Sequence, residues 1–347
     1  MRNGAQRDDE EWRDTKGKAG QDDFDRNDTD REPTDEEPAG AGAAAAVDSE
    51  TQRLSDTFDL QAHRGGRGER TEESRRAFEN ALDQNVTTLE FDIVLSADGV
   101  PVVWHDPEIQ EEKCTETEPV KKDDAQFPYV GKLVHDLDFE KLQTLNCNGA
   151  LEDFPDAQHE NDNRLLQLSD VLDIAEQDDD VRFNIETKIE AADPDKSASP
   201  QEFVDAIVPE LQKRDLTDRA TIQSFDWRSL PLVKEADSAI DTVMLYDDST
   251  WKPDSEWTGN VDFDAVDGDI TEAAEELDAD VLSPDYQLVD DALLDDAHTN
   301  NLPVIPWTAN DEEDLNRLID AGVDGIITDY PTRLREILNE RDIEFRD

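Results

Sequence analysis

Hydrophobic and polar positions along the chain change their pattern near residue 58. From there onward, short runs of mainly apolar residues alternate with longer stretches in which apolar residues recur at helical spacing. Such short runs are typical of strands, and the longer amphipathic stretches are typical of helices. The strand-like runs are 58–63, 87–95, 100–105, 181–188, 220–225, 241–246, 280–285, 302–308 and 325–329. Helices are expected between most of them, for example over 72–82, 168–176, 200–213, 290–298 and 312–321.

Alternating strands and helices predict parallel strands joined by helical crossovers. About eight such units fit a closed (β/α)₈ TIM barrel, for which about 250 residues is typical. An open doubly wound sheet is the alternative, but the glycine-rich run 65–68 lacks the spacing of a phosphate-binding loop. Residues 107–165 interrupt the alternation of strand-like and helix-like segments, so we expect them to form a small insertion on one face of the barrel.

Residues 1–57 differ from the rest of the chain because they hold many acidic residues and few large apolar ones. A segment of this kind buries too little apolar surface to offset the entropy lost on ordering. We therefore expect a disordered acidic tail, followed by one barrel domain over 58–347. The tail also lacks the basic start and apolar run of a secretory signal, which predicts a cytoplasmic location for the chain as given.

The charge of the protein excludes some classes of function. It has 33 Lys and Arg against 91 Asp and Glu, a formal net charge of −58. Binding to nucleic acid or to an anionic membrane is not expected, because both need clustered Lys and Arg. No run approaches the roughly 20 apolar residues of a membrane-spanning helix. An acidic surface with few lysines favours a protein adapted to high salt, and an ordinary acidic protein is the alternative.

Two cysteines, Cys114 and Cys147, both fall in the predicted insertion. They are too few for a cysteine-type zinc site or a disulfide scaffold. A single disulfide between them is one interpretation, but a cytoplasmic chain favours free thiols.

Candidate chemistry gathers where predicted strands end. His63 ends the first strand and is followed by Arg64, and His105 ends the run 100–105. Active sites of barrels are built at the C-terminal ends of strands. One histidine at a strand end is more often structural than catalytic, but two of them in polar clusters favour a functional site.

The run 87–95 places two carboxylates on one face. Because side chains alternate along a strand, Glu90 and Asp92 share the face opposite that of the apolar positions between them. The apolar side chains can pack on helices, so the two carboxylates are expected to point into the barrel. Burying them requires a compensating cation. The candidates are a salt bridge to Arg64 or Lys188 and a hard divalent metal ion.

The run 181–188 repeats this alternation, with Glu186 and Lys188 on one face. If its strand neighbours the run 87–95, Glu186 becomes a third carboxylate beside Glu90 and Asp92. Three carboxylates suit Mg²⁺ or Ca²⁺, while Arg64 and Lys188 add positive charge for an anionic group. Together with the two histidines, this set indicates metal-assisted phosphoryl chemistry.

The sequence resembles the glycerophosphodiester phosphodiesterase family in an ordered series of motifs. They are HRGGRGERTEESRRAFENAL, VTTLEFDIVLSADGVPVVWHDPEI, NIETK, IQSFD and GVDGIITDYP, within about residues 58–340. The resemblance implies a (β/α)₈ barrel with a small insertion after the His-Asp motif. It also implies cleavage of a small-molecule glycerophosphodiester to sn-glycerol 3-phosphate and an alcohol, with a divalent metal as cofactor.

The resemblance also implies roles for individual residues. The family's Pro-Glu-Asn-Thr motif reads TEES here, but its glutamate is kept as Glu72, which is expected near the substrate. Trp307 is expected to cover the substrate, with a packing role as the alternative. By motif, the metal ligands are Glu90, Asp92 and Glu186, the general acid/base pair is His63 and His105, and the phosphate is held by Arg64 and Lys188.

Two other functions are compatible with the same residues. A related phosphodiesterase would act on lysophospholipids or on another phosphodiester. An acidic barrel that binds without catalysis is the non-enzyme alternative. The sequence leaves open the alcohol head group, the choice between Ca²⁺ and Mg²⁺, the oligomeric state, and whether the glycerol 2-hydroxyl or water attacks phosphorus.

Overall fold

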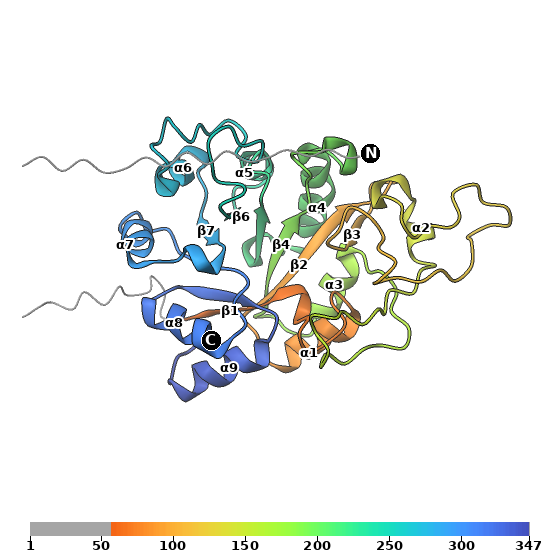
Figure 1. Cartoon of the computed structure of the whole chain (residues 1–347), viewed down its shortest axis with the longest axis horizontal. Coiled ribbons are helices and arrows are strands. Elements are labelled where there is room, and N and C mark those ends of the chain that lie inside the picture. Colours follow the sequence, from red (N-terminus) through yellow and green to blue (C-terminus); the bar gives the residue numbers. More distant parts are fainter. Residues whose placement is uncertain (1–56, 347) are drawn as a thin grey trace, which may run out of the picture. The chain divides into compact units, whose positions relative to one another are not determined.

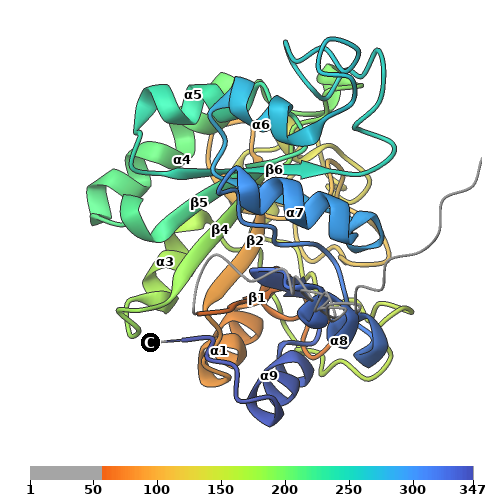
Figure 2. The ribbon, with the colours of Figure 1, turned by 90° about the vertical axis from the view of Figure 1, so that its left-hand side faces the viewer.

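A parallel sheet organises the protein, for which a computed structural model describes residues 57–346. Its strands follow the order β7-β6-β5-β4-β2-β1-β8, with helices outside them (Figures 1 and 2). These strands are β1 (Asp59–Ala62), β2 (Thr88–Leu95), β4 (Arg182–Thr187), β5 (Ala220–Ser224), β6 (Asp241–Tyr246), β7 (Val281–Pro284) and β8 (Gly325–Thr328). The predicted acidic tail lies outside the described residues except for Thr57, and its disorder stays a prediction.

The predicted strand 302–308 lies between the two ends of this sheet. Ile305 N donates to Leu282 O of β7 at 2.9 Å, and Ile327 N of β8 donates to Pro306 O at 3.0 Å. The segment is not a regular strand because its two prolines have no N–H to contribute to the ladder. Its hydrogen bonds on both sides nevertheless give the molecule a TIM-barrel-like arrangement.

The run 100–105 is not one of the parallel strands. It forms β3 (Pro101–Val103), which pairs antiparallel with β2. The turn between them, near Gly99, is far too short for the helical crossover that a parallel connection needs. The expectation of parallel strands is therefore wrong for this run.

The helices that the amphipathic pattern predicts are present, within a few residues of their expected ends. None of the described helices has the length and apolar content needed to cross a membrane. The helices are α1 (Arg75–Asp83), α2 (Phe139–Leu142), α3 (Leu168–Ala175), α4 (Pro200–Arg214), α5 (Ser229–Ala236), α6 (Ile270–Leu277), α7 (Asp291–Thr299), α8 (Glu312–Ala321) and α9 (Pro331–Glu340).

Helix α1 begins three residues later than predicted. Ser74 is its N-cap, and the Ser74 hydroxyl accepts a hydrogen bond from Ala77 N at 3.1 Å. Residues 72 and 73 therefore belong to the loop before the helix. Both of these glutamates are buried, and this loop carries them toward the carboxyl ends of the strands.

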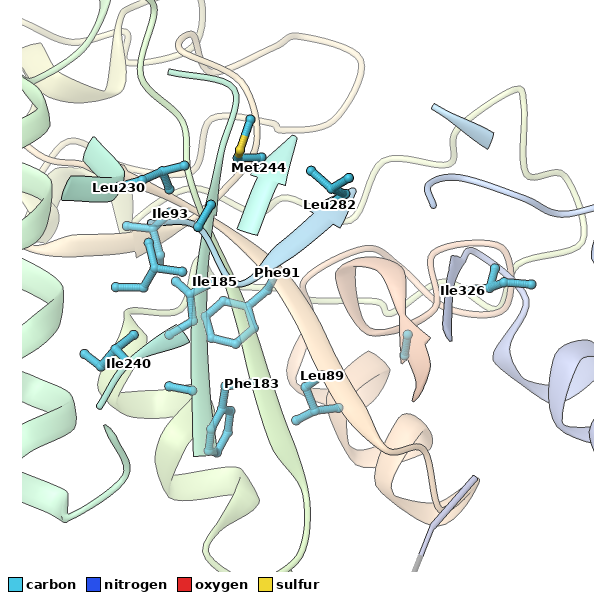
Figure 3. Close-up of a cluster of buried hydrophobic side chains, with 14 of the residues drawn as sticks. Leu89, Phe91, Ile93, Phe183, Ile185, Leu230, Ile240, Met244, Leu282 and Ile326 are labelled. Carbon is cyan, nitrogen blue, oxygen red and sulfur yellow. The ribbon is translucent and has the colours of Figure 1, made fainter. Parts of the chain in front are cut away.

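The main hydrophobic core lies between the strands and the surrounding helices. Leu89, Phe91 and Ile93 of β2 and Phe183 and Ile185 of β4 are buried in it (Figure 3). These are the alternate positions on each strand, so the residues between them face the inside of the barrel. The predicted inward direction of the carboxylates on β2 follows from this packing.

Residues 104–167 connect β3 to α3, largely without regular structure (Figure 1). They hold the short helix α2 and contribute most of a second, smaller hydrophobic cluster, which includes Trp104, Tyr129 and Leu142. A long segment with its own core is consistent with the expected insertion.

Cys114 and Cys147 form a disulfide, so the expectation of free thiols is wrong. Thr115 and Asn146, the adjacent residues, pair through an antiparallel bridge that brings the two cysteines together. The spacing of the two cysteines does not by itself indicate this pairing. Disulfides are typical of oxidising compartments, so this one does not support the predicted cytoplasmic location. That location stays a prediction.

Candidate active site

The candidate site lies where the parallel strands end. A cleft of about 120 Å³ opens there, and seven of the nine predicted site residues line it. The other two, Asp92 and Glu72, are buried but do not line the cleft. Six of the seven lining residues belong to the predicted metal, acid/base and phosphate-binding sets, and the seventh is Trp307.

Three carboxylates meet inside this end of the barrel. Strands β2 and β4 are neighbours, and their register places Asp92 directly beside Glu186. Glu90, Asp92 and Glu186 each offer an oxygen atom, and these oxygens lie within 4.8 Å of one another. All three residues are buried. Oxygen donors gathered at this distance fit a hard divalent cation.

Two basic side chains also approach the carboxylates. Arg64 Nε lies 2.8 Å from Asp92 Oδ2, and Lys188 Nζ lies 2.6 Å from Glu186 Oε1. The salt bridges considered from the sequence are thus both present. Among the described residues, neither oxygen of the buried Asp92 carboxylate accepts a well-aligned side-chain or backbone hydrogen bond. Arg64 and Lys188 are in ion-pair contact with it instead, at 2.8 and 3.8 Å.

The pKa values of the three carboxyl groups differ. Burial raises the pKa of Glu186 to about 7 and the pKa of Glu90 well above its ordinary value. Burial also acts to raise the pKa of Asp92, but Arg64 and Lys188 together hold that pKa below its usual range. A bound cation would favour the ionised form of all three groups.

His63 is held by a carboxylate behind it. Its Nδ1 lies 2.6 Å from Asp329 Oδ1, and its Nε2 lies 4.0 Å from Glu90 Oε2. Asp329 is fixed in turn by Arg67 Nε at 2.7 Å and Asn310 Nδ2 at 2.8 Å. Burial lowers the pKa of His63 to about 4 although the Asp329 anion acts to raise it. The free Nε2 of a neutral His63 therefore faces the carboxylates.

His105 has a similar arrangement at the start of residues 104–167. Its Nδ1 lies 3.0 Å from Asp106 Oδ1, and Asp106 Oδ2 accepts from Lys113 Nζ at 2.5 Å. Burial, with the positive charge of Lys188 and Arg64, lowers the pKa of His105 to about 3. The second imidazole is thus also neutral near pH 7, with its Nδ1 occupied.

The turn after β1 places Arg64. Arg64 has a left-handed backbone (φ 52°), and its N–H donates to Glu90 Oε2 at 2.9 Å. The next residue, Gly65, has φ 76°, and a Cβ there would lie 2.8 Å from the Ala77 Cβ. Glycine is therefore required for the tight passage from β1 toward α1.

Glu72 lies behind Arg64. Its carboxylate accepts from Arg64 Nη1 at 3.2 Å and lies 2.7 Å from Lys113 Nζ. The expected position near the site is therefore found, but a carboxylate paired with two cations is suited to orienting Arg64 and not to contacting a phosphate. Its neighbour Glu73, which sequence analysis gave no role, accepts a hydrogen bond from Asp92 N at 3.0 Å.

Trp307 forms part of an aromatic wall. Its ring lies 5.3 Å from that of Phe225, which in turn lies 6.4 Å from Trp257. The Trp307 indole N–H donates to Ser283 O at 2.9 Å. Trp307 lines the cleft and also packs, so its predicted substrate contact and the packing alternative are both compatible with its position.

Four residues around the histidines had no role in the sequence analysis: Asp329, Asp106, Arg67 and Lys113. Asp329 directly follows β8 and Asp106 follows His105, so the rule that active-site residues follow strand ends would have found both. Lys113 lies in the irregular segment 104–167, where no periodicity indicates a position.

Comparison with known proteins identifies the family of this chain. The sequence matches the Glycerophosphoryl diester phosphodiesterase family over residues 63–333. The glycerophosphodiester phosphodiesterase of Caldanaerobacter subterraneus subsp. tengcongensis is 25% identical over 280 residues, or 80% of this chain and 97% of that protein. Human lysophospholipase D GDPD1 is 24% identical over 300 residues, or 80% of this chain and 85% of that protein. A crystal structure from Silicibacter pomeroyi that carries the same family name has a TM-score of 0.72 at 25% identity, and covers 85% of this chain and 98% of that one. This protein therefore belongs to the glycerophosphoryl diester phosphodiesterase family.

Proposed function

We propose that this protein hydrolyses glycerophosphodiesters to sn-glycerol 3-phosphate and an alcohol, with a divalent cation bound and with two histidines transferring protons. The observation that carries this proposal is the convergence of three carboxylates, two imidazoles and two basic side chains at one end of the barrel. Side chains of these types in one cleft are the groups that phosphodiester cleavage needs.

Glu90, Asp92 and Glu186 would hold the cation, which we propose is Mg²⁺ or Ca²⁺. Their donor set contains only oxygen, the ligand atom that both ions prefer. A divalent cation bound there supplies positive charge against the negative charge that develops on the phosphodiester oxygens.

Arg64 and Lys188 are proposed to bind the phosphate. Both line the cleft, and both are kept charged because neighbouring carboxylates raise their pKa values despite burial. Their carboxylate partners fix their positions before substrate arrives. This arrangement stabilises charge without reorganisation during the reaction.

His63 and His105 are proposed to move the protons. Because the Nδ1 of each ring faces a carboxylate, Nε2 is the nitrogen available to substrate. One Nε2 takes the proton of the attacking hydroxyl as its oxygen bonds to phosphorus. The other Nε2 takes up a proton when the anionic phosphodiester binds beside it, because a nearby negative charge favours the imidazolium. It then gives this proton to the leaving alkoxide as the bond between phosphorus and the alcohol oxygen breaks. The attacking group is a water molecule, which gives sn-glycerol 3-phosphate directly, or the glycerol 2-hydroxyl, which gives a cyclic phosphate that a water molecule then opens.

The test measures release of sn-glycerol 3-phosphate from glycerophosphocholine by the full chain. We expect release with Mg²⁺ or Ca²⁺, loss of release after EDTA, and recovery when the ion is returned in excess. Release that EDTA leaves unchanged would contradict the role of the three carboxylates. No release under any condition would favour an acidic barrel that binds without catalysis.

A lysophospholipase D activity is the second candidate, because the human relative with that name aligns with 80% of this chain. The chemistry at phosphorus would be the same, but the cleft would have to accept an acyl chain. Parallel assays of glycerophosphocholine and lysophosphatidylcholine separate the two functions. We expect the smaller substrate to be preferred, because the cleft measures only about 120 Å³.

A further inference from the structure

The carboxylate of Glu90 is held at both oxygens by groups that only donate. Gln223 Nε2 of β5 donates to Glu90 Oε1 at 2.7 Å. The backbone N–H of Arg64 donates to Glu90 Oε2 at 2.9 Å. Two donors on opposite oxygens fix the plane of the carboxylate, whereas Asp92 and Glu186 are held mainly by cationic side chains.

Gln223 is itself fixed by a chain of side-chain amides inside the barrel. Asn184 Nδ2 of β4 donates to Gln223 Oε1 at 2.9 Å and also to Gln61 Oε1 of β1 at 2.8 Å. Gln61 Nε2 then donates to Asp59 Oδ2 at 2.8 Å. Gln61, Asn184 and Gln223 are all buried, each with at most 3% of its surface exposed. The chain thus runs between two carboxylates, Asp59 near the start of β1 and Glu90 near the end of β2.

The direction of every hydrogen bond in this chain follows from its centre. Thr221 Oγ1 donates to Asn184 Oδ1 at 2.8 Å, so the Asn184 amide presents its two N–H groups to the two glutamines. Each glutamine then accepts at its oxygen and must turn its own N–H₂ outward. An asparagine at the centre is therefore what makes both ends of the chain donors, as the two terminal carboxylates require.

Packing alone does not account for these residues. Barrel interiors are filled mainly by branched aliphatic side chains, and a buried amide costs free energy unless all its groups are satisfied. Here the three amides bond to one another and leave a donor at each end, one directed at Glu90 and the other at Asp59. Burying these amides costs free energy, which is consistent with a need for an N–H donor at the site. The side chain of leucine or valine has no such donor.

We propose that Gln223 and Asn184 are positioning residues that hold Glu90 in the orientation needed to bind the divalent cation. Neither residue would contact the cation. Gln223 acts on Glu90 directly, and Asn184 acts through Gln223. Outer hydrogen-bond partners of this kind typically change metal affinity by about 10–100-fold when they are replaced. This inference rests on the proposed function, in which Glu90 is a metal ligand.

The test compares metal binding by the wild type, Gln223→Met and Asn184→Asp. Methionine keeps the length of glutamine without its N–H₂, and aspartate keeps the shape of asparagine without its two donors. The control is Ser283→Ala. It removes a buried hydroxyl that donates to Ile305 O and takes no part in the chain of side-chain amides. The thermal unfolding midpoint is measured in EDTA and at increasing Mg²⁺ and Ca²⁺, together with the metal concentration that gives half-maximal activity.

We expect Gln223→Met to need about 10–100-fold more metal for the same rise in unfolding midpoint, and Asn184→Asp to shift in the same direction by less. Activity at saturating metal should recover toward the wild-type value in both. Ser283→Ala should match the wild-type metal requirement. A role in folding alone would lower the midpoint in EDTA and leave the metal requirement unchanged.

The inference is overturned if both variants bind metal within about twofold of the wild type while the wild type depends on metal. If Gln223→Met does not fold, the Asn184→Asp result decides by the same criterion. If the wild type gains neither stability nor activity from metal, the proposed function is contradicted, and so is the inference that rests on it. The two failures are therefore distinguishable in one set of measurements.

Discussion

Each site histidine uses one ring nitrogen to bind a carboxylate, so Nε2 is the nitrogen left for chemistry. A proton transfer by a positioned side chain is typically worth about 10²–10⁴-fold in rate. We predict that His63→Ala and His105→Ala each lower kcat by about this factor, with unchanged far-UV circular dichroism. Steady-state kinetics on glycerophosphocholine at saturating metal measure the effect. Turnover near the wild-type rate would remove that histidine from the mechanism.

Asp329 offers a finer test of His63. In Asp329→Asn the side chain keeps its size, but the negative charge that stabilises a protonated His63 is lost. We predict a loss in kcat of about 10–10³-fold, smaller than that of His63→Ala, with little change in KM.

The matched control for Asp329 is Asp226→Asn. Asp226 is equally buried and also pairs with an arginine, Arg228, but it contacts no predicted site residue. A similar loss in both variants would mean that Asp329 acts through folding and not through His63.

At the residue scale, strand alternation was sufficient to predict the inward carboxylates. Successive side chains along β2 point to opposite faces of the sheet. The apolar positions face the hydrophobic core, so the carboxylates between them face the inside of the barrel. Contacts made by irregular segments could not be predicted in this way. Lys113 reaches Glu72 and Asp106 because of how residues 104–167 fold. The pairing of Glu72 with two cations could not be predicted, and its expected place near the substrate stays a prediction.

At the scale of elements, the segment 104–167 depends on its disulfide. Cys114 and Cys147 close a loop with a sequence separation of 33 residues, for which the loss of unfolded-state entropy predicts about 3–4 kcal/mol of stabilisation. Lys113, next to Cys114, supports Asp106 beside His105. We therefore predict that the double variant Cys114→Ser/Cys147→Ser is less stable in chemical unfolding and also less active.

Reducing agent provides the control for the disulfide prediction. It should lower the unfolding midpoint of the wild type and have no effect on the double serine variant. Thiol titration of the unfolded wild type without reductant should detect no free thiol. Two free thiols in a fully stable and active protein would contradict the pairing.

The elements that the sequence predicted poorly share a physical cause. Periodicity reports which face of a segment is buried, and it identified the strands that carry the site. It does not report hydrogen bonding, so it could not separate the antiparallel β3 from the parallel strands. Pro303 and Pro306 are visible in the segment 302–308, but the apolar pattern takes no account of their missing N–H groups. The start of α1 was set by the Ser74 cap, which the apolar pattern does not contain.

At the scale of the whole molecule, negative charge is concentrated outside the core. Eight of the described Asp and Glu residues are buried, and several of these belong to the candidate site. Most of the acidic residues between 57 and 346 are therefore at least partly accessible, and the whole chain has a formal net charge of −58. Like charges at this density repel one another and oppose compact folding unless salt screens them.

We predict that the free energy of unfolding rises steeply with KCl, because the Debye length falls from about 10 Å at 0.1 M to about 3 Å at 1 M. Thermal unfolding at increasing KCl measures the effect. Sucrose, which favours compact states without screening charge, is the control and should raise the midpoint much less at equal osmolality. If sucrose stabilised the protein as strongly as KCl, charge screening would not be the cause. A midpoint independent of KCl over this range would identify an ordinary acidic protein and contradict adaptation to high salt.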